Sequence, residues 1–324
     1  MKAALNFSVK LLVSVALFYY LATSADLQGF GGLFRRADLA LSALAVACFF
    51  LSNALGAVQW YLLLRAQRLA VSLWQAVVFY WVGVFFNNVL LGNFGGDALR
   101  IYDVRRLTGE GTGAAAATFL DRFVGLFTTC ALAMVPFVLV AQVRGSRLVS
   151  VIFVVWLGLM AVLAAMLSRR VGGVLERLVC PLLPDRVAAV VVGLRQSVVV
   201  YREHPGLLVA AVAISLVVQF LRILVYWSAG LAVGLQVGLI NYVAFQPTAA
   251  IIASLPISIG GLGVRENVLV ELFGSVGVEE GAALAMSLLG YVAGIIASLL
   301  GGVAFAVRRV ERRAESRQEE RGEP

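Results

Sequence analysis

Two stretches of the chain decide its fold: LLGNFGGDALR (residues 90–100) and LPISIGGLGVR (residues 255–265). Each closes an uncharged apolar run, and each carries a Gly-Gly pair followed four residues later by an arginine. A shift of 165 residues places Leu90, Gly95, Gly96 and Arg100 on Leu255, Gly260, Gly261 and Arg265. Each stretch follows two apolar spans and precedes one more. Because three full spans, an odd number, separate the stretches, they predict two halves of opposite orientation, an inverted repeat typical of transporters.

The composition of the whole chain is that of a membrane protein. Of its 324 residues, 61% are apolar and only 14% are charged, whereas a soluble domain carries about 25% charged residues. The mean hydropathy is +0.94. These values exclude an ordinary globular enzyme, a disordered chain and a disulfide-rich secreted domain. Most of the net charge of +8 lies between apolar runs, where topology selects it, so we expect no nucleic-acid partner. We also expect no cofactor and no metal.

The apolar runs predict an all-α integral membrane protein. Full spans are expected at residues 11–25, 39–64, 114–143, 148–167, 206–233 and 282–307, with a basic connection at 169–204 on the membrane surface. The rival interpretation of the first span is a signal peptide. Residues 1–307 would form one membrane domain with halves at about 1–143 and 148–307. We expect the charged tail, residues 308–324, to be cytoplasmic, solvated and partly disordered.

The basic residues distinguish two topologies. With eight full spans, those outside the spans divide evenly, 12 on each side of the membrane. If the third and seventh apolar runs, residues 69–96 and about 242–263, are instead re-entrant, 19 basic residues lie on the inner side and five on the outer side. The positive-inside rule therefore favours about six full spans plus two re-entrant segments, with both termini in the cytoplasm. Non-helical backbone at membrane depth is tolerated only within protein or beside a water-filled cavity, so this topology predicts a cavity.

The Gly-Gly motifs suit an anion. Glycine lets a ligand approach the main chain, and a helix N-terminus offers N–H groups and a partial positive charge. Arg100 and Arg265 would add guanidinium forks for a phosphate. The alternative is that the glycines are only turns and the arginines are interface anchors. Asp97 is a functional carboxylate or the N-cap of a helix from Ala98 onward. Glu266 either pairs with Arg265 or faces the cavity.

Three charged residues, Asp121, Arg122 and Arg222, lie inside predicted spans. A charge at membrane depth is costly, so it normally faces a cavity, a partner or a substrate. The alternative is an internal ion pair, for example between Asp121 and Arg222. Arginines outnumber carboxylates here, and this surplus favours an anionic ligand. The candidate site comprises Gly95, Gly96, Asp97, Arg100, Asp121, Arg122, Arg222, Gly260, Gly261, Arg265 and Glu266. The same cavity is expected to be lined by Asn87, Asn88, Asn93, Gln219 and Gln246.

These motifs resemble, over nearly the whole chain, the flippase-like family typified by the membrane domain of lysylphosphatidylglycerol synthases. The segment GGDALR (residues 95–100) is similar to the first motif of that family, although LG at residues 91–92 stands where Pro-Gly is common. The pair DR at residues 121–122 is similar to its acidic-Arg motif, and LPISIGGLGVRE (residues 255–266) is similar to its closing motif.

The resemblance implies a protein of the plasma (inner) membrane of a bacterial-type cell. It would move, or help to move, an anionic or aminoacylated phospholipid between leaflets. Some members are labelled glycosyltransferases of archaeal glycan assembly and others are associated with hopanoid lipids, so the substrate does not carry over. In the synthases a soluble aminoacyl-transferring domain follows the membrane domain. We expect this chain to lack it, and a separately encoded lipid-modifying enzyme would be a natural partner.

Three functions fit these features. The first is a translocase for an anionic or modified phospholipid or a lipid-linked precursor, with the headgroup in an Arg-lined cavity between the repeats and no catalytic residue. No GxxxxGK[ST] loop is present, so energy would come from a gradient, or the protein would only equilibrate lipids. The second is a membrane-embedded glycosyl- or headgroup-transferase acting on a lipid carrier, with Asp97, Asp121 or Glu266 as base. The third is a small-anion transporter. We expect a transporter rather than an enzyme.

Overall fold

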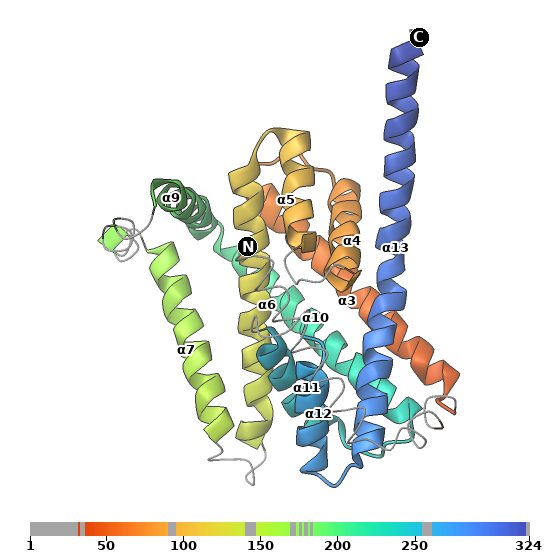
Figure 1. Cartoon of the computed structure of the whole chain (residues 1–324). Helices are drawn as coiled ribbons and strands as arrows, with labels where there is room; N and C mark the ends of the chain where they lie inside the picture. The colour runs from red at the N-terminus through yellow and green to blue at the C-terminus, as the bar shows by residue number, and fades with distance from the viewer. Residues whose placement is uncertain are drawn as a thin grey trace.

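The computed structural model describes residue 32 and residues 36–89, 95–139, 147–168, 173–174, 177, 181, 184–254 and 261–321. Within these residues all regular structure is helical (Figure 1), which confirms the predicted all-α fold. Some features considered from the sequence lie outside the described residues, namely the span at 11–25, Leu90, Asn93, Leu255 and Gly260.

Four long helices form the frame of the molecule: α3 (Leu39–Ala66), α6 (Gly111–Leu139), α10 (Pro205–Ala232) and α13 (Glu280–Arg321). Each contains an apolar stretch long enough to cross a membrane, because 28 residues extend about 42 Å and the hydrocarbon core is about 30 Å thick. α3 and α10 pack most extensively against each other, while α6 and α13 each contact both of them. These helices match four of the predicted spans.

A first pair of shorter helices, α4 (Leu73–Val89) and α5 (Gly95–Thr108), packs antiparallel and is called the first hairpin. The direction follows from Gly83, which lies against Gly96 near the tip of the pair, and from Phe79, which shares a pocket with Asp103 farther back. α4 has 17 residues and extends only about 26 Å, which is shorter than the hydrocarbon core.

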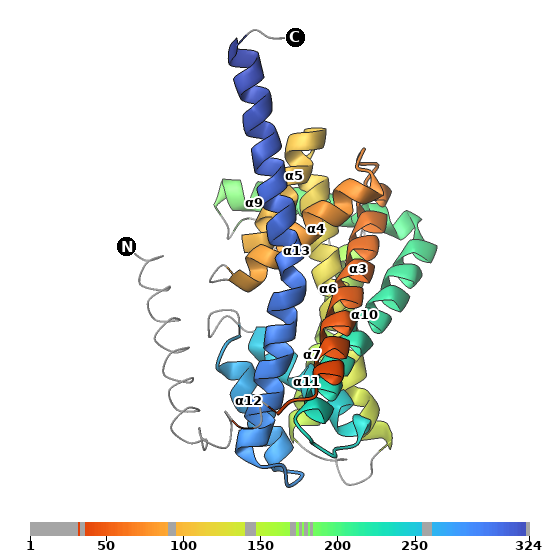
Figure 2. The same ribbon diagram turned by 90° about the vertical axis from the view of Figure 1, so that its right-hand side faces the viewer.

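A second pair, α11 (Leu239–Ser254) and α12 (Val264–Gly274), packs in the same way and is called the second hairpin. Ala253 lies against Gly261 near its tip, and the rings of Phe245 and Phe273 meet farther back at 5.1 Å. Figures 1 and 2 place the first hairpin in the upper half of the molecule and the second in the lower half. The hairpins occupy the positions of the two predicted re-entrant segments.

Each hairpin packs against a long helix from the other part of the chain. α13 contacts α4, and α6 contacts α11, both over long interfaces. The approach of α13 to α4 is close, because a Cβ at Gly301 would collide with the backbone carbonyl of Trp81. Small residues permit such contacts between membrane helices. The two hairpins are thereby held between the four long helices.

The remaining helices lie at the edge and the upper end of the bundle. α7 (Arg147–Leu167), at a predicted span, packs on α6, and α9 (Asp185–Val199) lies near the upper end (Figure 1). The short 3₁₀ helix η3 (Val200–Glu203) is tied to α3, since the Tyr201 hydroxyl donates to the Leu63 carbonyl at 3.0 Å.

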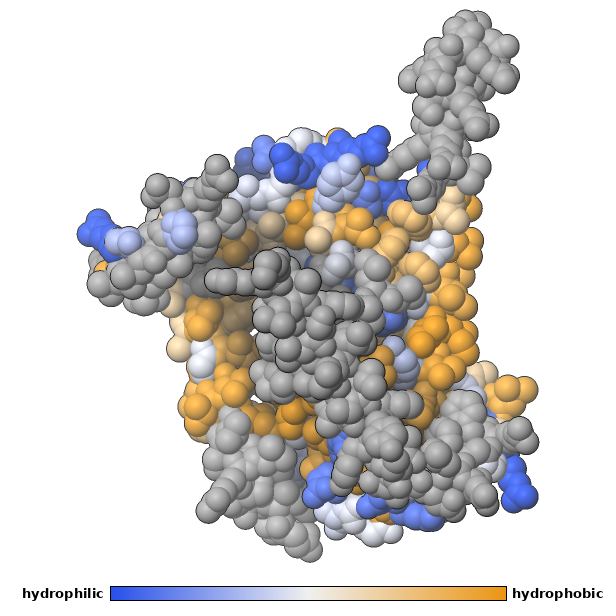
Figure 3. Space-filling view, in the orientation of Figure 1, coloured by the Kyte–Doolittle hydropathy of each residue, from blue (hydrophilic) through white to orange (hydrophobic). Residues whose placement is uncertain are grey.

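The C-terminal segment differs from the expectation. The sequence predicted a partly disordered tail from Arg308, but α13 continues as one helix to Arg321 and extends beyond the other helices (Figures 1 and 2). The segment is rich in Glu and Arg, which have high helix propensity, so nothing in it up to Arg321 ends the helix. In Figure 3 the described surface is hydrophobic across the middle and hydrophilic at both ends, as a membrane-spanning bundle requires.

Candidate functional site

One cavity of about 530 Å³ lies between the long helices and the two hairpins and is called the Arg cavity. Its wall includes the four arginines singled out from the sequence: Arg100, Arg122, Arg222 and Arg265. Asp121 also lines it. Further polar side chains in the wall are Asn53, Gln59, Tyr80, Asn87, Asn88, Thr129, Ser215, Gln219, Tyr226, Gln246 and Ser254. The fold thus brings together arginines from α5, α6, α10 and α12 that lie up to 165 residues apart in the sequence.

Arg122 lies about 17 Å along α6 from its first residue and forms a bidentate ion pair with Asp97. Its Nε donates to Asp97 Oδ2 at 2.8 Å, and its terminal nitrogen donates to Oδ1 at 2.9 Å. The Asp97 carboxylate is buried, but half of the Arg122 side-chain surface, 50%, stays exposed. One side of this guanidinium is therefore held by the protein, and the other remains accessible from the cavity.

Arg100 is the buried centre of the same network. It donates to Asp97 Oδ1 at 2.5 Å and to Asp121 Oδ2 at 3.5 Å. Its guanidinium also lies over the ring of Trp60 at 5.1 Å and that of Tyr80 at 4.7 Å. Only 3% of its side chain is exposed. With two carboxylates and two aromatic faces around it, Arg100 is fixed in place.

The remaining oxygen of Asp121 is also occupied, because Gln59 Nε2 donates to its Oδ1 at 2.9 Å. Asp121 therefore pairs with Arg100, and the pairing with Arg222 that the sequence suggested is wrong. The reason is geometric: α5 packs against α6 and places Arg100 beside Asp121. Gln59 and Tyr80 were missed by the sequence analysis. The signal that could have identified Gln59 is a glutamine inside the apolar span of α3.

The first Gly-Gly pair serves the packing of the first hairpin. A Cβ at Gly96 would collide with the Gly83 carbonyl, and the Gly96 N–H donates to Asn87 Oδ1 at 2.8 Å. α5 begins at Gly95, so Asp97 lies within its first turn and is not the N-cap. This N–H is already bonded to the protein, and Gly95, Gly96 and Asp97 do not form part of the cavity wall. Asp97 acts through the arginines that it holds.

The second Gly-Gly motif uses a local carboxylate. Glu266 is fully buried; its Oε2 accepts from the Gly263 N–H at 2.7 Å, and its Oε1 accepts from Arg265 Nε at 3.2 Å. The Arg265 guanidinium also lies over the Tyr291 ring at 5.1 Å. Gly261 and Gly263 adopt φ of +76° and +82°, which other residues rarely adopt. Of the two outcomes considered for Glu266, the structure has the local pair, and only Arg265 reaches the cavity wall.

Arg222 is the exception among the four arginines. It lies about 26 Å along α10 from Pro205, in a helix about 42 Å long. It makes no hydrogen bond or ion pair with any residue that the structure describes, and its Nε is buried without an acceptor. Four arginines and three carboxylates therefore leave one cation unpaired among the described residues near the cavity. An unpaired charge at this depth is expensive.

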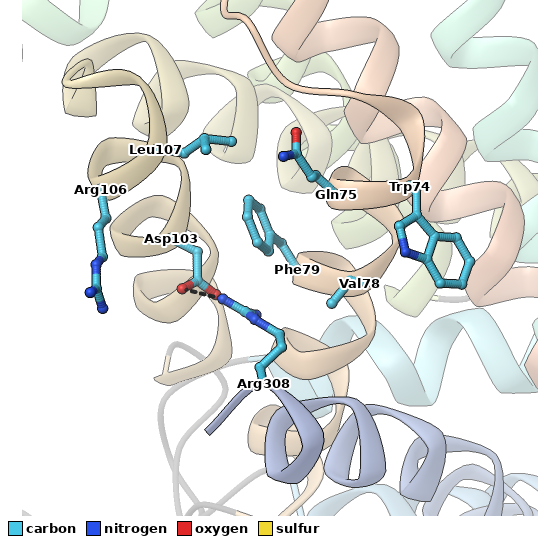
Figure 4. A pocket seen from close by; sticks show the side chains of 8 residues that line it. All are labelled: Trp74, Gln75, Val78, Phe79, Asp103, Arg106, Leu107 and Arg308. Atoms are coloured by element: carbon cyan, nitrogen blue, oxygen red, sulfur yellow. Dashed lines mark hydrogen bonds and ion pairs between the residues drawn. The ribbon is translucent and has the colours of Figure 1, made fainter. Parts of the chain in front are cut away.

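A second pocket, of about 440 Å³, lies between α4, α5 and α13 and holds an ion pair that the sequence did not predict. Arg308 donates to both oxygens of Asp103, at 3.1 and 2.9 Å, and its guanidinium lies over Phe79 at 4.9 Å. Figure 4 shows this pair, with Arg106 set apart from it. The sequence assigned Arg308 to a solvated tail, whereas it joins α13 to the first hairpin.

The chain is similar in sequence to known membrane proteins. Residues 7–302 match the family model described as the lysylphosphatidylglycerol synthase TM region. A UPF0104 membrane protein of Pyrococcus horikoshii is 21% identical over 301 residues, covering 86% of this chain and 90% of that protein. A UPF0104 membrane protein of Methanothermobacter thermautotrophicus is 27% identical over 297 residues, covering 82% and 83%. The chain is therefore a multi-pass membrane protein that belongs to the lysylphosphatidylglycerol synthase transmembrane-region family.

Proposed function

We propose that this protein is a translocase that moves an anionic or modified phospholipid, or a lipid-linked precursor, between the leaflets of a membrane. The headgroup would enter the Arg cavity and bind Arg222. The observation that carries the proposal is this cation, which lies deep in a membrane helix with no partner among the described residues. A phosphate would supply the missing negative charge. Membership in the lysylphosphatidylglycerol synthase transmembrane-region family supports a lipid-related role.

The translocase would work by alternating exposure of the cavity between two inverted repeats. α3–α4–α5–α6 and α10–α11–α12–α13 repeat the order long, short, short, long. In each set a glycine of the first helix lies against a tyrosine of the second: Gly56 against Tyr80, and Gly230 against Tyr242. The two hairpins lie at opposite heights in the molecule (Figure 1). Rocking of one set against the other would open the cavity to each side in turn.

The proposed setting is a bacterial-type inner membrane with the upper end of Figure 1 in the cytoplasm. The turns after α3 and α5 and the C-terminal end of α13 lie together at that end. Basic residues gather in these segments, among them Arg65, Arg68, Arg105 and Arg106. An excess of basic residues is characteristic of cytoplasmic loops. This orientation places the C-terminus in the cytoplasm.

The ion pairs argue against the alternative, a membrane-embedded transferase. Such an enzyme would use Asp97, Asp121 or Glu266 as a general base. Each of these carboxylates already accepts hydrogen bonds from an arginine, so its oxygens are engaged by the protein. Their observed contacts suit support of the arginines better than proton abstraction.

The proposal is tested with purified protein in liposomes that contain a trace of fluorescent phosphatidylglycerol. A membrane-impermeant reductant is added outside, and loss of the protected inner-leaflet signal reports translocation. We expect rapid loss with the wild type and a strongly reduced rate with Arg222→Gln. Arg106→Gln is the matched control, because Arg106 is an exposed arginine beside the other pocket. Absence of lipid movement with the folded wild type, for phosphatidylglycerol and for polyprenyl phosphate, would contradict the proposal.

A further inference from the structure

The charges of the Arg cavity favour one class of headgroup. We infer that it selects a phosphodiester headgroup with one net negative charge and no amino group, such as that of phosphatidylglycerol, over an aminoacylated headgroup. This inference rests on the proposed function and narrows its substrate class. It follows from counting which charged groups in and around the cavity are already occupied.

No carboxylate around the cavity is open to an ammonium group. Both oxygens of Asp97 accept from Arg122, and Asp121 accepts from Gln59 and from Arg100. Both oxygens of Glu266 are likewise used, by the Gly263 N–H and by Arg265. An ammonium carries a full positive charge, which the neutral amide and hydroxyl oxygens of the wall can hydrogen-bond but do not balance. In this cavity it would meet arginine guanidinium groups and no free carboxylate among the described residues.

Two arginines of the Arg cavity are, by contrast, available to a ligand. Arg222 has no hydrogen bond or ion pair with a described residue, and half of the Arg122 side chain is exposed. Four arginines against three carboxylates leave one positive charge in excess, so one phosphodiester charge balances the cavity. Gln246 lines the same wall, and its side-chain amide would suit the hydroxyl groups of a glycerol headgroup.

This charge balance sets an order of affinity. Phosphatidylglycerol brings the one negative charge and neutral hydroxyl groups, so it ranks first. Phosphatidylethanolamine adds one ammonium beside the arginines and ranks second. Lysyl-phosphatidylglycerol adds two amino groups and is net positive, so it ranks last. We expect the first and last lipids to differ in affinity by roughly tenfold or more, because like charges in a desolvated site repel strongly.

The order is tested by native mass spectrometry of the full chain in detergent with equal concentrations of the three lipids. We expect the wild type to bind phosphatidylglycerol preferentially. Arg222→Gln should lose most of this preference, and Arg222→Lys, which keeps the charge, should retain it. Arg106→Gln should behave as the wild type. A thermal unfolding curve of each variant verifies that it is folded.

Two results would overturn the inference: binding of lysyl-phosphatidylglycerol by the wild type as tight as that of phosphatidylglycerol, or an unchanged preference in folded Arg222→Gln. Its failure is distinguishable from failure of the proposed function. If phosphatidylglycerol binds preferentially but no lipid moves in liposomes, the selectivity stands and the translocase proposal fails. If phosphatidylglycerol and lysyl-phosphatidylglycerol bind equally well and both move between leaflets, the translocase proposal stands and the inferred selectivity fails.

Discussion

The two hairpins carry the same signature, Gly-Gly followed by an arginine, but hold that arginine in different ways. In the first hairpin Arg100 is bound by Asp97 and by Asp121, which comes from α6. In the second, Arg265 is bound by Glu266, its neighbour in the chain. The first arrangement joins separate helices into one network, whereas the second is completed within a single helix turn.

The difference extends to how each hairpin satisfies its backbone. The Gly96 N–H donates to Asn87 of the partner helix α4, whereas the Gly263 N–H donates to Glu266 of its own helix. A shift of 165 residues places Ala57 on Arg222, so the unpaired cation also belongs to only one set of helices. The same Gly-Gly signature therefore marks both hairpins, while the charged groups around them differ.

The largest expected effect comes from removing the local carboxylate of the second hairpin. Glu266→Ala leaves the Arg265 guanidinium and the Gly263 N–H without their partner in a fully buried position. Loss of one partner of a buried ion pair costs about 3–5 kcal/mol. Thermal unfolding in detergent measures the loss, and Glu271→Ala on the exposed side of the same helix is the control. Equal stability of the two variants would contradict the role assigned to Glu266.

A smaller loss is expected from crowding the first hairpin. In Gly96→Ala the new methyl group meets the Gly83 carbonyl, so α4 and α5 have to separate. Overpacking of this kind costs about 1–3 kcal/mol. Gly158→Ala is the matched control, because nothing lies within 4 Å of a Cβ at that helical position. The comparison is made by the midpoint of thermal unfolding, and a wild-type midpoint for Gly96→Ala would show that the contact is not tight.

Neutralising the shared carboxylate of the first hairpin separates stability from binding. Asp97→Asn removes the charge that holds Arg122 and so leaves a second cation of the cavity uncompensated. We expect a loss of stability below that of Glu266→Ala, since Arg122 is half exposed and the buried Arg100 keeps Asp121 as a partner. We also expect tighter binding of phosphatidylglycerol. Native mass spectrometry measures the bound fraction. Weaker binding by the folded variant would mean that Asp97 positions Arg122 for the lipid instead of competing with it.

The smallest effect is expected outside the cavity. Asp103→Asn removes the charge that pairs with Arg308, but the new amide keeps one oxygen that can accept a hydrogen bond from that guanidinium. We therefore expect a loss of about 1 kcal/mol, the net contribution of a single hydrogen bond. The headgroup preference should stay that of the wild type, because neither residue lines the Arg cavity. A changed preference would show that the contact between α13 and the first hairpin controls the cavity.

The sequence predicts the helices of this protein better than their contacts. The apolar runs predicted α3, α10 and the other long helices, because the thickness of the bilayer sets the length of a span. The Gly-Gly motifs marked the tips of both hairpins. The partner of Asp121 was not predictable in this way, because pairing depends on how α5 turns toward α6. The continuation of α13 past Arg308 was not predicted. A charged segment indicates exposure to solvent, but charge alone does not end a helix.

The candidate site shows the same division. Arg122 and Arg222 were singled out because a charge at membrane depth is energetically unfavourable, and both line the cavity. The sequence suggested that the glycines expose the main chain to an anion. In the structure, Gly96 packs against α4 and its N–H is bonded to Asn87. Tyr80 carried no signal, because an aromatic residue in an apolar span is usual. The packing of helices that are distant in the sequence, and not the residue type, determines which polar groups line the Arg cavity.

The most direct test of phosphate binding by Arg222 is a cryo-electron microscopy structure of the full chain in nanodiscs of phosphatidylglycerol. We expect density for a lipid phosphate inside the Arg cavity, at a hydrogen-bond distance of about 3 Å from the Arg222 guanidinium. We also expect this density to be lost in Arg222→Gln. Phosphates bound only around the outside of the bundle, with Arg222 paired to a protein carboxylate, would show that Arg222 does not bind a lipid headgroup.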